Sequence, residues 1–161
     1  MKSTIELINF IDISSEEKKM VLSWRNHQDI RRWMSNKKEI TIEEHLNYIA
    51  SLHNKKDRIY FLVKELNEYL GVIDFTNIVK NEFSEFGIYT KPGLVGVGSK
   101  LMNMIIEYAF KILKLKKLIA NVYTNNEKAI KLYKKFNFIE IKVDTDSNGE
   151  FIQMELKNEN R

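Results

Sequence analysis

The spacing of apolar and polar residues predicts two amphipathic helices in the first third of the chain. Residues 14–17 (Ser-Ser-Glu-Glu) and 41–44 (Thr-Ile-Glu-Glu) both have the capping-box pattern, a hydroxyl followed three residues later by a carboxylate. The first box predicts a helix that runs into Arg25, and the second predicts a helix that reaches Leu52. Two early helices of this kind need a sheet or further helices to cover their apolar faces.

Runs of β-branched and aromatic residues predict strands in the rest of the chain, at 59–63, 69–75, 85–89, 118–123, 138–143 and 151–156. The first two form a hairpin around Asn67-Glu68, and the last two flank the polar turn 144–149. The strand at 118–123 is expected to be buried on both faces. Helices are predicted over about 99–114 and from Asn126 onward, where apolar residues recur every three or four positions. The pattern indicates an α/β or α+β fold, with a mixed sheet and helices on both faces, in a single domain over residues 1–161.

A glycine-rich turn joins the strand at 85–89 to the helix that follows. The apolar run stops at Lys91-Pro92-Gly93, and further glycines stand at Gly96 and Gly98. A strand that turns through glycines onto a helix N-terminus presents unpaired backbone N–H groups at the positive end of the helix. This arrangement predicts a pyrophosphate cradle, and therefore a nucleotide-type cofactor.

Composition narrows the kind of protein. Hydrophobic residues make up 43% of the 161 residues, as in folded proteins, and cysteine is absent. Disulfides, thiolate metal sites and a cysteine acyl-enzyme intermediate are therefore excluded, and a cytoplasmic location is expected. The first ten residues lack the apolar stretch of a signal peptide, and no run approaches transmembrane length. Three histidines without a carboxylate cluster at ligand spacing give no metal-site signal.

The net charge of +4 does not predict nucleic-acid binding, because 26 basic residues are interleaved with 22 acidic ones. The densest basic cluster lies on one predicted helix whose other face is apolar, and it comprises Lys128, Lys131, Lys134 and Lys135. A solvated helix face explains this cluster more simply than a phosphate-reading stripe. A modest positive field would still help to recruit polyanionic small molecules. Neither a nucleic-acid partner nor a membrane is expected.

Two motifs together resemble the GNAT superfamily of acetyl-CoA-dependent N-acetyltransferases. The glycine turn is similar to its pyrophosphate loop, Gln/Arg-x-x-Gly-x-Gly/Ala, and residues 126–138 are similar to its Asn-x-x-Ala-x-x-Leu-Tyr…Gly-Phe segment. The resemblance implies a GNAT-like fold, a mixed and mostly antiparallel sheet of about seven strands, with acetyl-CoA as co-substrate and no metal. Two positions depart from the pattern. Gly93 replaces the usual Gln or Arg, and Asn137 replaces a glycine where Asn still suits a left-handed helix end.

The N-terminal third is similar to one branch of this superfamily, the ribosomal-protein N-acetyltransferase-like enzymes. The similarity rests on residues 24–27 (Trp-Arg-Asn-His) and 43–45 (Glu-Glu-His). Within the branch it extends to the enzymes that acetylate UDP-4-amino-4,6-dideoxy sugars in pseudaminic acid biosynthesis, which supplies flagellin glycosylation. The alternatives are N-terminal acetylation of a ribosomal protein and a non-catalytic module that binds acyl-CoA or nucleic acid. Family members often pair into dimers, so a homodimer is one expected state.

The resemblance also implies roles for single residues. Tyr133 is the candidate general acid for the departing CoA thiolate, and the alternative is a core aromatic residue at helical spacing. Glu85 is the candidate general base, acting through a water, with Glu82 and Asp74 as alternatives. For each, the competing interpretation is a carboxylate on a solvent-facing strand.

Acetyl-CoA contacts are implied for a strand edge, the glycine turn and the start of the last helix; they involve Gly87, Ile88, Tyr89, Leu94, Val95, Gly96, Val97, Gly98, Ser99 and Asn126. Among these, the Ile88 amide is a candidate oxyanion donor, and Asn126 is either a pantetheine ligand or an ordinary N-cap. Arg25 and His45 are candidate ligands of the sugar nucleotide, although a helical Arg or His is more often structural. Trp33 and Met34 either line a pocket for the deoxy-sugar methyl or cover the core.

Overall fold

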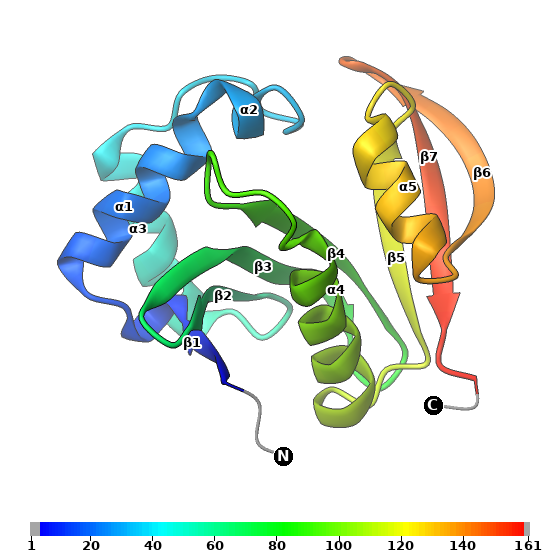
Figure 1. Ribbon diagram of the computed structural model, residues 1–161, viewed down its shortest axis with the longest axis horizontal. Coiled ribbons are helices and arrows are strands. Elements are labelled where there is room, and N and C mark those ends of the chain that lie inside the picture. Colours follow the sequence, from blue (N-terminus) through cyan, green and yellow to red (C-terminus); the bar gives the residue numbers. More distant parts are fainter. Residues whose placement is uncertain (1–3, 160–161) are drawn as a thin grey trace.

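The computed structural model describes residues 4–159 and builds them around one seven-stranded sheet (Figure 1). The strand order is β1-β2-β3-β4-β5-β7-β6. The strands are β1 (Ile5–Asn9), β2 (Ile59–Glu65), β3 (Glu68–Val79), β4 (Phe83–Thr90), β5 (Lys117–Tyr123), β6 (Ile139–Asp146) and β7 (Gly149–Lys157). The main helices are α1 (Ser15–Asn26), α2 (Gln28–Arg31), α3 (Ile42–Ser51), α4 (Gly98–Glu107) and α5 (Glu127–Lys135). Short 3-10 turns lie at η1 (Phe10–Asp12) and η2 (Leu52–Asn54).

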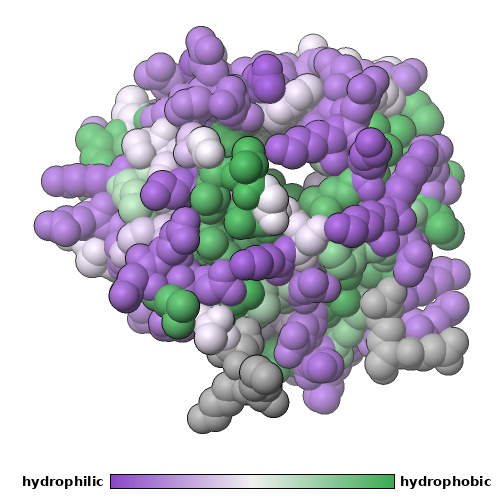
Figure 2. All heavy atoms as spheres, in the orientation of Figure 1, coloured by the Kyte–Doolittle hydropathy of each residue, from purple (hydrophilic) through white to green (hydrophobic). Residues whose placement is uncertain are grey.

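Every neighbouring pair of strands is antiparallel except β4 and β5, which run parallel. That parallel pair is short, because it begins at Phe83 with Lys117 and ends at Glu85 with Ile119. Beyond Glu85 the two strands diverge, as Figure 1 shows, and Figure 2 shows the surface hollowed between β4 and α5. The predicted mixed and mostly antiparallel sheet of seven strands is confirmed.

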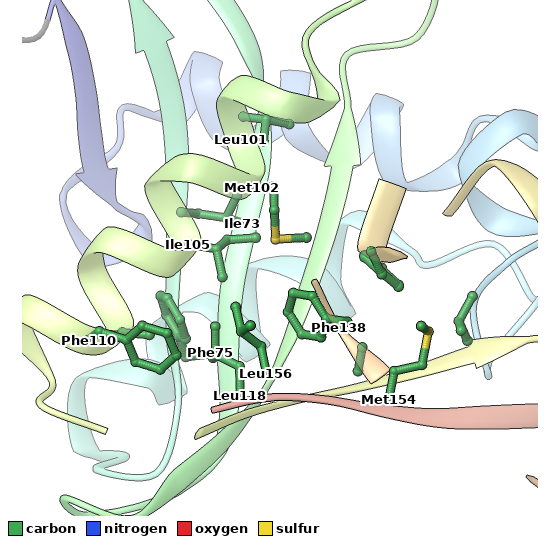
Figure 3. Close-up of a cluster of buried hydrophobic side chains, with 14 of the residues drawn as sticks. Ile73, Phe75, Leu101, Met102, Ile105, Phe110, Leu118, Phe138, Met154 and Leu156 are labelled. Atoms are coloured by element: carbon green, nitrogen blue, oxygen red, sulfur yellow. The ribbon is translucent and has the colours of Figure 1, made fainter. Parts of the chain in front are cut away.

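Helices cover both faces of the sheet. On one face, α4 and α5 enclose the larger apolar core, in which Phe75, Leu101 and Met154 are wholly buried (Figure 3). On the opposite face, α1 and α3 pack on a second cluster that contains Trp24 and Leu62. Burying side chains of this size contributes about 1.5–3 kcal/mol each. The two apolar layers therefore hold the sheet rigidly on both sides of β3 and β4.

Both predicted capping boxes are present. Ser14 Oγ accepts the Glu17 amide at 3.1 Å while Glu17 Oε1 accepts the Ser14 amide at 2.9 Å. Thr41 and Glu44 make the same reciprocal pair at 3.1 and 3.0 Å. These bonds satisfy donors that a helix start otherwise leaves unpaired. The hairpin of β2 and β3 is also confirmed.

Three features differ from the sequence-based expectations. The strand β1 was not predicted. The predicted burial of 118–123 on both faces is wrong, because Asn121 in β5 is exposed on the face that α4 and α5 do not cover. The helix predicted over about 99–114 is α-helical only to Glu107, after which a π-helix, η3 (Tyr108–Ile112), follows. Within residues 4–159, no helix is both long and apolar enough to cross a membrane.

Candidate active site

The divergence of β4 from β5 leaves one edge of β4 open in the middle of the sheet. Residues 86–90 pair with β3 on one side, but the pairing with β5 has already ended at Glu85. An unpaired strand edge offers backbone N–H and C=O groups to an extended ligand. The predicted pantetheine contacts Gly87, Ile88 and Tyr89 all lie on this edge.

A chain segment after α2 crosses from the N-terminal half of the molecule to the β6–β7 hairpin. The Ser35 carbonyl accepts a hydrogen bond from Asn148 Nδ2 at 2.7 Å, and Lys37 Nζ lies 5.4 Å from the centre of the Tyr123 ring. We call residues 32–38 the strap. Because the strap joins the two sides of the divergence, the hollow of Figure 2 is bounded on this side as well.

The glycine turn has the backbone of an anion cradle. Gly93 and Gly96 adopt φ angles of 85° and 79°, and a Cβ atom on either would meet nothing within 4 Å. Glycine is therefore needed there for conformation and not for space. Val97 caps α4 without a side-chain hydrogen bond, and the first helical bond runs from Leu101 N to Val97 O at 3.1 Å. The amides at the start of α4 lack helical acceptors, which fits the diphosphate of acetyl-CoA.

Lys135 stands beside this cradle, a position that the sequence analysis did not predict. Its Nζ donates to Ser99 Oγ at 2.8 Å, so the last turn of α5 reaches the first turn of α4. Gly98 also faces Leu132 of α5, with a Cβ position 3.5 Å from that side chain. The sequence signal was the basic cluster of α5, which was interpreted as a solvated face. Lys135 supplies a cation where Gly93 lacks a polar side chain.

Tyr133 projects from α5 toward the inner part of β4. Its ring lies 5.5 Å from that of Phe86 and 5.6 Å from that of Phe138, and the residue is only 7% exposed. Across residues 4–159 its hydroxyl has no hydrogen-bond partner. Burial, and then the negative charge of Asp74, raise the pKa of Tyr133. The phenol therefore stays protonated at neutral pH and is free to donate.

The ends of α5 place Tyr133. Asn126 Oδ1 accepts the Ala129 amide at 3.3 Å, so the capping role of Asn126 is confirmed, while its pantetheine contact stays a prediction. Asn137 ends the helix with a φ of 73°, which confirms the left-handed position expected there.

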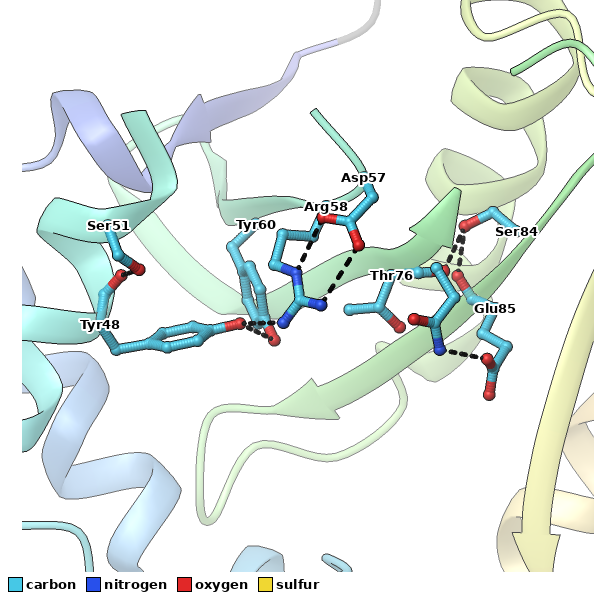
Figure 4. A network of polar contacts seen from close by, with 9 residues as sticks. Tyr48, Ser51, Asp57, Arg58, Tyr60, Thr76, Ser84 and Glu85 are labelled. Carbon is cyan, nitrogen blue, oxygen red and sulfur yellow. Dashed lines mark hydrogen bonds and ion pairs between the residues drawn. The ribbon is translucent and has the colours of Figure 1, made fainter. Parts of the chain in front are cut away.

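The side chain of Glu85 lies on the same face of the sheet as Asn121, the face that α4 and α5 do not cover. One carboxylate oxygen accepts Asn121 Nδ2 at 2.7 Å, and the other accepts Asn77 Nδ2 (Figure 4). Asn77 reaches it from an irregular stretch of β3, with a φ of 52°. Glu82 lies at the closed end of the β4–β5 pair, where it forms an ion pair with Lys116 at 3.2 Å. The third candidate, Asp74, lies on β3 directly opposite Gly87 of β4.

The predicted acceptor ligands divide into two groups. Arg25 donates from one terminal nitrogen to the Asn36 carbonyl at 2.9 Å; its other terminal nitrogen is buried, without a partner among residues 4–159. Burial lowers the pKa of Arg25. His45 is 8% exposed, and its Nε2 lies 2.8 Å from the Lys18 carbonyl, a contact that ties α3 to α1. Burial lowers the pKa of His45 as well, so its geometry is that of a structural residue.

Trp33 and Met34 lie near the beginning of the strap, and both are partly exposed. The Arg32 guanidinium lies 5.1 Å from the centre of the Trp33 ring. Neither side chain belongs to the two buried clusters, which favours a surface or pocket role over core packing. Over residues 4–159, no group of three or more His, Asp or Glu side chains is arranged to hold a metal ion.

Comparison with known proteins decides the family. A family described as "Acetyltransferase (GNAT) domain" matches residues 8–139, which span the sheet from β1 to the start of β6. The chain belongs to the acetyltransferase (GNAT) family. It is therefore an acetyltransferase whose acetyl donor is acetyl-CoA, and the glycine cradle and the open edge of β4 fit this donor.

Two groups of known acetyltransferases are similar to this GNAT enzyme. The acetyltransferase PseH of Campylobacter jejuni is 45% identical over 142 residues, which cover 88% of this chain and 89% of that protein. Its crystal structure with acetyl coenzyme A matches with a TM-score of 0.80 and 39% identity, covering 96% of this chain and 99% of that one. A Vibrio cholerae spermidine N-acetyltransferase, solved with CoA and spermine, has a TM-score of 0.85 at 18% identity over 97% and 96% of the chains. The last similarity shows the fold alone.

Proposed function

We propose that this enzyme acetylates the 4-amino group of UDP-4-amino-4,6-dideoxy-N-acetyl-β-L-altrosamine in pseudaminic acid biosynthesis, by direct transfer from acetyl-CoA in the cytoplasm. The product would supply flagellin glycosylation. The observation that carries the proposal is the 45% identity with PseH over nearly the whole length of both proteins. The open β4 edge supports direct transfer. An acetyl group bound at this edge can be reached by an acceptor amine from the face of the sheet opposite α5.

Acetyl-CoA supplies an activated acetyl thioester, and the chain's own groups hold and orient it. The amides of residues 95–99 receive the diphosphate, and Leu94 positions the turn before them. Backbone groups of Gly87, Ile88 and Tyr89 pair with the pantetheine arm, and the Ile88 amide donates to the thioester oxygen. Asn126 adds a contact to the pantetheine arm.

Tyr133 acts as the general acid. Its hydroxyl proton passes to the sulfur that leaves, and the hydroxyl is suited to this because nothing in residues 4–159 engages it. A phenol with a raised pKa holds its proton at neutral pH until a strong acceptor forms beside it. Glu85, fixed by two amides, lies on the acceptor side of the sheet.

Arg25 and the strap form the acceptor side of the site. The unpaired N–H groups of Arg25 suit a diphosphate or a uracil carbonyl, which would also satisfy a buried donor. Trp33 and Met34 provide apolar surface for the deoxy-sugar methyl. The structure gives His45 a bond between helices, so its part in the site is to hold α3 against α1.

The test measures free CoA released by the purified enzyme with three acceptors separately. These are the UDP-4-amino sugar, the N-terminal peptide of a ribosomal protein, and spermidine. Turnover with the amino sugar, together with a product heavier by one acetyl group, is the expected result. Turnover only with peptides or with spermidine would refute the sugar assignment, and turnover with none would favour a binding module.

We also propose that the enzyme forms a homodimer through the edge strand β6. Its side chains Ile139, Ile141 and Val143 are 45–57% exposed, and one edge of the strand is unpaired within residues 4–159. A second copy would cover both features. Sedimentation equilibrium should give a dimer mass, and Ile141→Lys should shift it to the monomer. A wild-type monomer at all concentrations would contradict the proposal.

A further inference from the structure

A carboxyl group lies in the middle of the sheet, over β4 in the stretch where that strand has left β5. Asp74 of β3 stands directly opposite Tyr60 of β2 and directly opposite Gly87 of β4. Cross-strand partners have Cβ positions about 4.5–5.5 Å apart, so a side chain on β3 reaches over β4 at this point. As a residue Asp74 keeps some exposed surface, while its carboxyl group is packed closely against β4.

Gly87 makes room for this carboxyl. A Cβ atom on Gly87 would lie 2.3 Å from Asp74 Oδ2 and 2.9 Å from its Cγ. Such distances are too short for any residue but glycine to be accommodated without displacing the carboxyl group. Because Gly87 has no side chain, Asp74 rests against the backbone of β4, at the strand edge where the pantetheine arm is proposed to bind.

The carboxyl and the Tyr133 phenol approach β4 from opposite faces. Phe86 contacts Tyr133 on the α5 face, and the next residue, Gly87, contacts Asp74 on the α1 and α3 face. Consecutive strand residues point to opposite sides of a sheet. A reacting group held at the β4 edge would therefore have an acid on one side and a carboxylate on the other.

We propose that Asp74 is the general base that takes the proton from the acceptor amine, an inference that rests on the acetyltransferase function proposed above. The amine nitrogen forms a bond to the acetyl carbon as the carbon–sulfur bond breaks. One proton moves from the nitrogen to the Asp74 carboxylate, and one moves from Tyr133 to the sulfur. Asp74 then releases its proton to solvent and Tyr133 regains one, so the enzyme returns to its starting state.

The surroundings of Asp74 raise its pKa toward the range that suits a general base. Burial raises its pKa from the ordinary value to about 7, against the opposing effects of the Gly87 backbone and the positive charge of Arg58. The titratable groups that face it are Tyr60, Tyr89 and Tyr133, each with a pKa raised by burial and by the charge of Asp74. A base whose pKa lies near the working pH is the most effective kind.

Glu85 is the alternative base, and its environment differs. Asn121 and Asn77 each donate to one of its carboxylate oxygens, whereas no side chain in residues 4–159 donates to Asp74. Glu85 is thereby fixed by two side-chain amides, while the carboxyl of Asp74 interacts with the backbone of Gly87 and with no side-chain donor in the described residues. The two carboxylates are thus separable by experiment.

The experiment compares Asp74→Asn with Glu85→Gln by the pH profile of kcat for acetyl transfer to the amine that wild-type enzyme accepts. Asp74→Asn should lower kcat about 100-fold or more and abolish the rise of kcat through pH 7. Acetyl-CoA affinity, measured by calorimetry, should stay within about twofold of wild type, because Asp74 does not hold the donor. Glu85→Gln should keep the rise through pH 7.

Gly87→Ala provides a second variant for the case that Asp74→Asn does not fold. It should lower kcat and shift the pH profile, because its Cβ displaces the carboxyl. A normal kcat and profile in Asp74→Asn, or loss of the inflection in Glu85→Gln instead, would overturn the proposal. Wild-type enzyme that transfers acetyl to no amine would refute the proposed function itself, which distinguishes the two failures.

Discussion

Tyr133 is a residue whose single hydroxyl can be removed with little change in packing. Its ring contacts Phe86 and Phe138, and these contacts survive in Tyr133→Phe. The substitution deletes only the proton donor, so kcat should fall about 100-fold or more while the acetyl-CoA dissociation constant remains close to that of wild type. Steady-state kinetics and calorimetry on the same preparation test this. An unchanged kcat would show that Tyr133 is a core residue without a catalytic role.

Asp74 should also affect stability in a pH-dependent way. The folded protein holds the carboxyl proton up to a pKa of about 7, whereas the unfolded chain releases it near the ordinary value of 3.8. Between these pH values the unfolded state binds fewer protons, so the free energy of unfolding falls as the pH rises. Asp74→Asn removes this titration and should therefore be relatively more stable at pH 8 than at pH 4.

Urea denaturation at both pH values measures the effect. Since one pKa unit corresponds to ~1.4 kcal/mol, the stability of the variant relative to wild type should increase by about 2–4 kcal/mol between pH 4 and pH 8. Glu85→Gln serves as the carboxylate control. An identical pH dependence in wild type and Asp74→Asn would show that Asp74 titrates normally.

At the scale of elements, local signals were readable from the sequence and long-range ones were not. The capping boxes and the hairpin of β2 and β3 depend on neighbouring residues, and both were predicted. The strand β1 was missed because its partner is remote, with Ile5 opposite Glu65. The exposure of Asn121 was missed because no helix covers that face of β5, which depends on where the chain places α1 and α3.

The candidate site also contains residues that local sequence signals predict and residues that only long-range packing places. The cradle glycines and Tyr133 belong to short motifs, so they could be predicted as site residues from the sequence alone. Which carboxylate lies over the unpaired stretch of β4 depends on the register that sets Asp74 opposite Gly87 and on the point where β4 leaves β5. Lys135 was missed because its meeting with Ser99 requires two helices to pack end to end.

The contact between α4 and α5 predicts a role for Lys135 in binding acetyl-CoA. Lys135→Ala should weaken acetyl-CoA binding several-fold, because a cation beside the diphosphate is lost where Gly93 offers no side chain. Added salt should reduce the difference in acetyl-CoA affinity between the variant and wild type, because salt screens the charge of Lys135. Lys134→Ala is the matched control, since Lys134 pairs with Glu140 at 3.4 Å on the same helix. Equal affinities for wild type and both variants would place the diphosphate elsewhere.

At the scale of the whole molecule, the sheet divides beyond the closed end of the β4–β5 pair, and the two sides meet again where α5 contacts β4 and α4 and where the strap crosses. The divergence after Glu85 opens the edge of β4 on which we propose that the donor binds. The strap closes the other side, where the Ser35 carbonyl accepts Asn148 from the β6–β7 hairpin. The proposed donor and acceptor sites therefore depend on different parts of the structure.

Cutting the strap contact should separate the two sites. Asn148→Ala removes the 2.7 Å bond to Ser35 and so loosens the strap, which carries Trp33 and Met34, the proposed acceptor surface. The KM for the amino-sugar acceptor should rise several-fold, because part of the binding energy must then order the strap. The acetyl-CoA dissociation constant should not change, because the cradle lies on α4. Ser147→Ala, in the same turn and without a side-chain hydrogen bond across residues 4–159, should behave as wild type. An acceptor KM that is equal in all three proteins would mean that the strap does not form part of the acceptor site.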